Sequence, residues 1–169
     1  MEIILIRHAL AMDREIFANK FKKDDSQRPL VMKGKKKMFK IAKHLRAWEP
    51  KIDLLVTSPY VRARETTQII KRFYPKTPVL EAAELVPAAP PYAFLNWLHS
   101  QSAKVKTIAV IGHEPCLGNF ASYCLCGEGE AILTLKKSGA ICLEIDALSS
   151  LGAGTAQLKW LITPKMFGN

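Results

Sequence analysis

Arginine and histidine side chains stand at the ends of three short apolar runs of the sequence. Arg7 and His8 end the first run, Arg62 follows the second after a short turn, and His113 follows the third. A guanidinium group matches phosphate oxygens with its planar fork, and a neutral imidazole can attack phosphorus. If these groups meet in space, they form a pocket for a doubly charged tetrahedral oxyanion. Such a pocket predicts phosphoryl-group chemistry, which depends mainly on positioning and charge stabilisation.

The two histidines are expected to play different parts in this chemistry. His8 suits the nucleophile because an adjacent cation, Arg7, lowers the pKa of its imidazole. It needs one bare ring nitrogen, with the other held by an acceptor such as a backbone carbonyl. His113 can stay protonated and neutralise charge that builds on the oxygens. No metal and no other cofactor is expected, since the His-Glu-x-x-His spacing, carboxylate clusters and phosphate-binding glycine loop are absent from the sequence.

The apolar runs indicate the strands that must position these side chains. Residues 3–6, 53–57 and 107–111 fit fully buried parallel strands, and residues 79–80 fit a shorter one. Ligands bind at the carboxyl ends of the strands in open α/β sheets. Strand-like runs also occur near the C-terminus, at residues 132–135, 140–145 and 157–162.

Helices are predicted between the parallel strands. Gly34 precedes an amphipathic helix with one apolar stripe, formed by Met38, Ile41, Ala42, Leu45 and Trp48. Ser58 is expected to cap the next helix, with Pro59 at its first position. Two more helices are predicted, one over residues 92–99 and one from Pro115 to the break at Gly127-Glu128-Gly129. The long connection of residues 9–32 is expected to be a lid or binding loop.

This order of elements predicts the fold class. Alternating strands and helices followed by hairpins indicate a three-layer α/β/α fold, with a mainly parallel sheet and antiparallel additions toward the C-terminus. The chain has 169 residues, a normal length for one domain with a full core, so a single domain over residues 1–169 is expected. The N-terminal apolar run is too short for a signal peptide, and no segment is long enough to span a membrane, which favours a cytoplasmic protein.

The net charge of +10 favours an anionic partner. Between Lys33 and Arg46 there is no acidic residue, and this basic run is either a solvated helix face or a surface that steers an acidic partner. Aromatic residues are not interleaved with the lysines, which argues against binding of single-stranded nucleic acid.

Several short motifs resemble those of a known family. They are Arg7-His8-Ala9, Ser58-Pro59-x-x-Arg62-Ala63-x-x-Thr66, Gly112-His113-Glu114-Pro115, and Arg28-Pro29-Leu30 followed by Gly34. In this order they resemble the histidine phosphatase superfamily, with its phosphoglycerate mutase-like fold, and most of all its SixA-type phosphohistidine phosphatases. Ala9 stands where glycine is commoner, and Val31 where relatives often have threonine.

The resemblance implies a role for each matched residue. His8 would be the nucleophile that forms a phosphohistidine intermediate, and Arg7, Arg62 and His113 would bind phosphate. The general acid is left open between Glu84 and Glu114. The expected partner is a phosphorylated protein carrying phosphohistidine, or a small phosphorylated substrate, with no nucleic acid or membrane and with the protein as a monomer.

Two other functions remain open from the sequence. A small-molecule phosphomonoesterase or a mutase would use the same fold and the same four residues. A mutase must keep water away from its phosphoryl group, and the chain has little extra length to build that enclosure. A non-catalytic module that binds phosphoprotein or nucleic acid would also fit the basic charge, but an intact His8 argues against it.

Overall fold

The sheet is mainly parallel with antiparallel strands from the C-terminal part of the chain, as the sequence predicts. The computed structural model describes residues 1–90, 92–101, 104–127 and 131–167, and in these ranges six strands form one sheet in the order β3-β2-β4-β1-β5-β6. The strands are β1 (Glu2–Arg7), β2 (Leu54–Thr57), β3 (Val79–Glu81), β4 (Thr107–Gly112), β5 (Ala140–Glu144) and β6 (Gln157–Ile162). β1 to β4 run parallel, β5 pairs antiparallel with β1, and β6 pairs antiparallel with β5.

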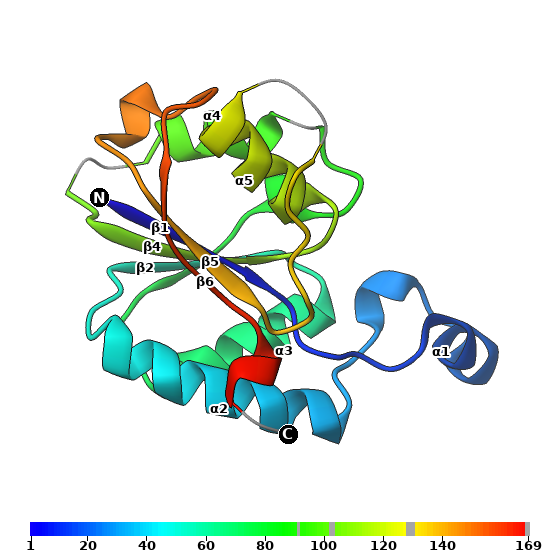
Figure 1. Cartoon of the computed structure of the whole chain (residues 1–169). Coiled ribbons are helices and arrows are strands. Elements are labelled where there is room, and N and C mark those ends of the chain that lie inside the picture. The colour runs from blue at the N-terminus through cyan, green and yellow to red at the C-terminus, as the bar shows by residue number, and fades with distance from the viewer. Residues whose placement is uncertain (91, 102–103, 128–130, 168–169) are drawn as a thin grey trace.

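Helices cover both faces of this sheet (Figure 1). α2 (Met32–Trp48) and α3 (Val61–Lys71) lie on one face, and α4 (Ala93–His99) and α5 (Cys116–Cys126) lie on the other. α1 (Arg14–Phe21) projects away from these layers, between β1 and α2 in the chain. Short 3₁₀ helices complete the described part: η1 (Asp25–Gln27), η2 (Ala83–Leu85), η3 (Leu148–Ser150) and η4 (Pro164–Phe167). The expected three-layer α/β/α fold is confirmed.

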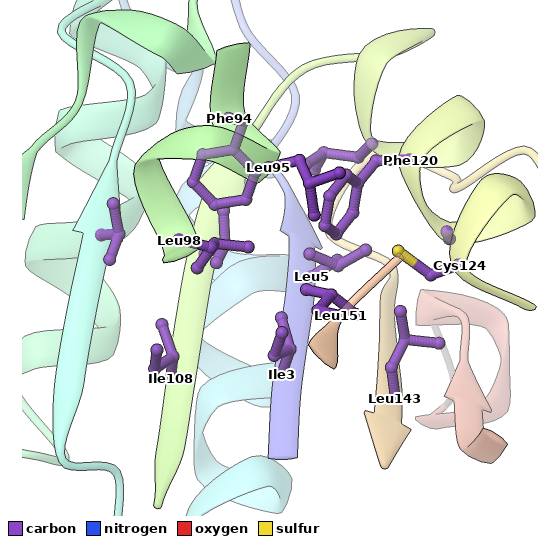
Figure 2. Close-up of a cluster of buried hydrophobic side chains, with 14 of the residues drawn as sticks. Ile3, Leu5, Phe94, Leu95, Leu98, Ile108, Phe120, Cys124, Leu143 and Leu151 are labelled. Atoms are coloured by element: carbon purple, nitrogen blue, oxygen red, sulfur yellow. The ribbon is translucent and has the colours of Figure 1, made fainter. Parts of the chain in front are cut away.

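Strand β1 is buried on both faces of the sheet. Ile3 and Leu5 pack into the core under α4 and α5, which Figure 2 shows, whereas Ile4 and Ile6 pack into the core under α2 and α3. Burial of each such side chain contributes about 1.5–3 kcal/mol. The two cores therefore hold β1 firmly in place, and with it the residues at its carboxyl end.

The first boundary that differs from the prediction is the start of α2. This helix begins at Met32, so that Gly34 lies inside it and not before it. A Cβ atom on Gly34 would lie 2.2 Å from the carbonyl oxygen of Leu10, so only glycine lets α2 approach the chain just after His8 this closely. The predicted apolar stripe is buried except for Trp48, which is 47% exposed at the end of the helix and packs edge-on against Trp160.

The start of α3 also differs from the prediction. Tyr60, and not Ser58, is the N-cap, and the helix begins at Val61. The backbone N–H of Ser58 donates to the carbonyl of Ile111 at 3.0 Å, which continues the pairing of β2 with β4 by one residue. The Ser58 hydroxyl pairs with His113 at 2.9 Å. Ser58 is therefore part of the strand exit, and its side chain is used elsewhere.

The predicted strand at residues 132–135 is wrong, because the backbone of this segment bonds to side chains. The N–H groups of Ile132 and Leu133 donate to the Ser122 hydroxyl at 3.0 and 3.3 Å. Leu135 is buried and likewise pairs with side chains. The helix predicted from Pro115 ends where the sequence predicts a break. α5 ends at Cys126 and Gly127 is its C-cap, while Glu128 and Gly129 lie outside the described residues. None of the described helices is long and apolar enough to cross a membrane.

Candidate active site

The sheet brings three strand ends together in its centre. β2, β4 and β1 are neighbours, and they lead directly into Ser58, His113 and His8. The N–H of His8 donates to the Gly112 carbonyl at 3.0 Å, so the chain after β1 stays in register with the end of β4. The rings of His8 and His113 consequently lie 5.1 Å apart between centroids.

His8 is held in the form that a nucleophile needs. Its Nδ1 lies 2.7 Å from the carbonyl oxygen of Ala9, so Nδ1 carries the proton and Nε2 is bare. The N–H of Ala9 donates to the Thr66 hydroxyl at 3.0 Å, which fixes this turn of the chain against α3. Burial, together with the charges of Arg62 and Arg7, lowers the pKa of His8 to about 3, against the opposing effect of the Ala9 hydrogen bond. The imidazole is therefore neutral at physiological pH.

His113 is buried beside His8 and has one unused ring nitrogen. Its Nε2 lies 2.9 Å from the Ser58 hydroxyl, and its ring packs edge-on against Tyr60. Burial lowers its pKa to about 2, with His8 and Arg62 acting in the same direction. An anion bound next to the ring would oppose these effects and favour the protonated form.

The two arginines converge on the same buried region with part of their donors unused. Arg7 Nη1 donates to the Leu135 carbonyl at 2.7 Å, and Arg62 Nη1 donates to the Asp25 carbonyl at 2.9 Å. Burial lowers the pKa of each, yet both guanidinium groups stay charged. In the described part of the chain, the buried side-chain nitrogen and oxygen atoms without a hydrogen-bond partner are Arg7 Nε, Arg62 Nε and His113 Nδ1.

These three unpartnered nitrogens are suited to binding an anion. A buried donor without an acceptor costs about 1–3 kcal/mol, so folded proteins rarely leave one unless a ligand completes it. A tetrahedral oxyanion offers several acceptor oxygens at once and carries the charge that two guanidinium groups require. The arrangement can therefore bind a phosphoryl group and present it to the bare nitrogen of His8.

Two charged residues of this region were not assigned a role from the sequence. Arg28 donates through Nε to Asp25 at 2.8 Å and through Nη1 to the Met12 carbonyl at 2.7 Å. It is close enough to lower the pKa of both His8 and His113. Asp25 also pairs with Arg62 Nη1 at 3.1 Å. The sequence feature that could have indicated a role for them is the Arg28-Pro29-Leu30 motif. It lies in the long connection that was expected to be a lid or binding loop.

The two candidate acids lie in different surroundings. Glu114 accepts a hydrogen bond from the Leu135 N–H at 2.8 Å. Burial raises the pKa of Glu114, against the effects of the Leu135 hydrogen bond and the charge of Arg7. Glu84 is half-buried in η2 and lines a cavity of about 560 Å³ together with Cys116 and Asn119. The choice between them as general acid stays a prediction.

The basic residues lie on α2 and at the rim of the site. The N-terminal end of α2 packs against Leu10, and Lys33 and Lys36 are exposed there. Lys137 is exposed as well, and partial burial together with Arg7 and Arg28 lowers its pKa. Lys137 therefore lies close to two arginines of the candidate site, and two further exposed lysines lie at the start of α2.

The group of side chains best suited to a metal ion lies elsewhere. Among the described residues, Glu2, Glu49 and Cys142 are the one set of three potential ligands whose atoms lie within 4.8 Å of one another. Glu2 begins β1, so this set is at the opposite end of the strand from His8. The Lys159 ammonium already pairs with both carboxylates. The set fits an internal ion pair better than a metal.

The sequence and the fold agree on the class of protein. A family model of the histidine phosphatase superfamily (branch 1) matches residues 3–86, which include Arg7, His8 and Arg62. An uncharacterised protein of Picosynechococcus sp. is 32% identical over 168 residues, covering 98% of each chain. The chain belongs to the histidine phosphatase superfamily.

Solved structures resemble this chain over nearly its whole length. The structure of the protein histidine phosphatase SixA complexed with tungstate has a TM-score of 0.79 and 23% identity, covering 97% of each chain. The α-ribazole phosphatase from Shigella flexneri has a TM-score of 0.71 and 15% identity, also covering 97% of each chain. These likenesses show the shared fold, and with it the phosphoglycerate mutase-like class expected from the sequence.

Proposed function

We propose that this protein is a phosphohistidine phosphatase, which removes the phosphoryl group from a phosphohistidine side chain of a partner protein. The observation that carries the proposal is the set of three buried, unpartnered nitrogens on Arg7, Arg62 and His113, next to the neutral imidazole of His8. Tungstate is a tetrahedral oxyanion like phosphate, and SixA, which has the same fold, binds it.

The reaction takes two steps at phosphorus. His8 Nε2 attacks the phosphorus atom, the new P–N bond forms, and the bond from phosphorus to the substrate imidazole breaks. The leaving nitrogen keeps the electron pair and takes a proton. Water then attacks the phosphohistidine of the enzyme, the P–N bond to His8 breaks, and inorganic phosphate leaves.

Each cationic group has a distinct role in these steps. Arg7 and Arg62 direct their Nε atoms at the oxygens of the phosphoryl group, whose charge stays high throughout the transfer. His113 donates from Nδ1 and becomes easier to protonate when the dianion is bound. No metal is needed to neutralise the negative charge of the phosphoryl group, because two arginines and a protonated histidine supply positive charge.

A phosphohistidine substrate suits the state of the candidate acids. An imidazole has an unperturbed pKa of about 6.5, so it leaves without a strong, well-placed acid. An alkoxide has a conjugate acid near the pKa of water, ~15.7, and leaves well only when it is protonated. Glu114 already accepts a hydrogen bond from Leu135, and Glu84 lies in a cavity wall. Hydrolysis of phosphohistidine therefore depends less on either carboxyl group than hydrolysis of an ester would.

One observation favours a second candidate, a small-molecule phosphomonoesterase. The cavity of about 560 Å³ beside Glu84 is lined by apolar and aromatic residues, among them Tyr92, Phe94 and Tyr123. A small substrate could place an apolar group there and receive a proton from Glu84. The fold is also that of an α-ribazole phosphatase.

A panel of substrates with and without a chelator separates the two. The protein should hydrolyse a phosphohistidine-bearing protein faster than phosphoserine or sugar phosphates, and the chelator should leave the rate unchanged. Faster hydrolysis of a small ester would favour the second candidate. Loss of activity with the chelator would contradict a metal-independent reaction.

A further inference from the structure

Asp25 joins the exposed arm of residues 12–29 to the proposed phosphate site. It begins η1 and pairs with three arginines: Arg14 on α1 at 3.3 Å, Arg28 at 2.8 Å and Arg62 on α3 at 3.1 Å. Arg14 is 73% exposed at its side chain, whereas Arg28 and Arg62 are 12% and 3% exposed. The two buried arginines thus share one carboxylate.

The pairing with Asp25 divides the guanidinium group of Arg62 into two sides. Nη1 is bound by Asp25 through both its carbonyl at 2.9 Å and its carboxylate at 3.1 Å, whereas the buried Nε has no partner. A guanidinium is planar and rigid, so holding Nη1 sets the direction of Nε. The Tyr60 ring, 4.8 Å from the guanidinium carbon, supports the plane from its face.

Asp25 also balances charge at this point. Arg28 and Arg62 repel each other, and within the described ranges no other carboxylate is paired with either of them. Their hydrogen bond and charge lower the pKa of Asp25 against the effect of its partial burial, so it stays ionised. Without this negative charge, the repulsion between Arg28 and Arg62 would be unbalanced, and Arg62 Nη1 would be held by the Asp25 carbonyl alone.

The arm has few other attachments to the layers of the fold. On α1 only Phe17 is buried. Besides the Asp25–Arg62 pair, the base of the arm is closed by Arg28 Nη1 on the Met12 carbonyl at 2.7 Å and by the Met12 N–H on the Pro29 carbonyl at 2.9 Å. The position of the arm is therefore tied to an arginine of the site.

We propose that Asp25 is a positioning residue, which orients Arg62 so that its Nε meets the transferred phosphoryl group. The inference rests on the proposed role of Arg62 in oxyanion binding. It gives the arm a function in the chemical step. Asp25 would act on the phosphoryl group only through Arg62 and would not touch it.

Two variants and one matched control test this role. Asp25→Ala removes the carboxylate, and Asp25→Asn keeps an acceptor without the charge. Asp24→Ala is the control, because Asp24 caps the same turn through the Ser26 N–H at 2.9 Å and has no contact with Arg62 among the described residues. Tungstate affinity and kcat/KM are measured for each, with circular dichroism to confirm folding.

We expect Asp25→Ala to lower both quantities by about tenfold to a hundredfold, the range for losing a charged hydrogen bond. Asp25→Asn should lie between it and the wild type, and Asp24→Ala should stay near the wild type. In an Arg62→Ala background, Asp25→Ala should have little further effect, because its action passes through Arg62. Equal losses with and without Arg62, or equal losses in Asp24→Ala, would show a merely structural role and overturn the inference.

The same data separate this inference from the proposed function. If Arg62→Ala binds tungstate as tightly as the wild type, the proposed oxyanion site itself is wrong. If Arg62→Ala loses tungstate and Asp25→Ala does not, only the role of Asp25 is wrong.

Discussion

Arg7 and Glu114 bind opposite sides of the same backbone residue, Leu135. Arg7 Nη1 donates to the Leu135 carbonyl at 2.7 Å, and the Leu135 N–H donates to Glu114 Oε1 at 2.8 Å. Leu135 is itself buried. The segment before β5 is thus fastened to the candidate active site by one cation and one carboxylate, which makes Glu114 a structural residue as well as a candidate acid.

The double role of Glu114 predicts different results for two substitutions. Glu114→Gln keeps an acceptor oxygen for Leu135, and we expect it to lower phosphohistidine hydrolysis by about tenfold or less, below the 10²–10⁴-fold typical of general acid catalysis. Glu114→Ala leaves the Leu135 N–H without its acceptor and should cost about 1–3 kcal/mol of unfolding free energy. Urea unfolding and steady-state kinetics measure the two effects.

Glu84→Gln is the matched variant for this prediction, and it too should lower phosphohistidine hydrolysis by about tenfold or less. Activity on an alkyl phosphate ester should fall much further in whichever variant has lost the true acid. A loss of phosphohistidine activity on the order of a thousandfold in either folded variant would contradict the leaving-group argument.

The buried histidines predict an acid-sensitive fold. Burial lowers the pKa of His8 to about 3 and that of His113 to about 2, from the ordinary value of 6.5. Between those values and 6.5 the unfolded chain binds more protons than the folded one, so the free energy of unfolding falls as the pH falls. Each histidine contributes a slope of about 1.4 kcal/mol per pH unit once the pH is well below 6.5.

Urea unfolding from about pH 7 to about pH 4.5 measures this slope. His8→Asn removes one of the two titrations, so its slope should be smaller than that of the wild type. Tungstate should reduce the slope as well, since the bound anion favours the protonated form of His113. An unchanged slope in His8→Asn would mean that the histidine is not protected from protonation.

The close approach of α2 to Leu10, just after His8, predicts that only glycine is tolerated at position 34. Gly34→Ala places a Cβ 2.2 Å from the Leu10 carbonyl oxygen, which a rigid backbone cannot accommodate without a shift. We expect a loss of about 1–3 kcal/mol of unfolding free energy, together with lower activity from displacement of the chain after His8. Gly152→Ala is the control, because a Cβ there meets nothing within 4 Å. Similar stability of both variants would refute the packing argument.

The basic end of α2 is expected to steer a protein substrate. Replacing Lys33 and Lys36 by Gln should lower kcat/KM for a phosphohistidine protein, whose surface can come close to these lysines. A small substrate bound at the histidines should be unaffected, because exposed charges are screened beyond ~8 Å at physiological ionic strength. Replacing Lys76 and Lys106, exposed near the amino ends of β3 and β4, makes the same change in net charge away from the site. Equal effects of the two pairs, or equal salt sensitivity for both substrates, would remove this role.

Much of the sheet and the candidate site could be predicted because the information is local. The β-branched runs at residues 3–6 and 107–111 indicate buried strands, and an arginine or histidine at the end of each stands out from its surroundings. Parallel pairing then places the carboxyl ends of these strands at the same edge of the sheet. His8 Nδ1 even meets the kind of partner that was expected, a backbone carbonyl.

The parts that could not be predicted depend on contacts between distant residues. Ser58 looks like a helix cap until its hydroxyl is paired with His113, which is 55 residues away. Residues 132–135 form a strand-like apolar run, but their backbone partners are side chains of Ser122, Glu114 and Arg7. Asp25 meets Arg62 across 37 residues, and no local pattern indicates such a pair.

The phosphorylated form of the enzyme gives the most direct test of the account. Incubation with a phosphohistidine protein, an alkaline quench and mass spectrometry of the peptides should place a phosphoryl group on His8. A P–N bond should survive base and be lost in acid, and His8→Ala should show neither the phosphopeptide nor turnover. A phosphoryl group on another residue, an alkali-labile bond, or turnover by His8→Ala within about tenfold of the wild type would contradict the proposed nucleophile.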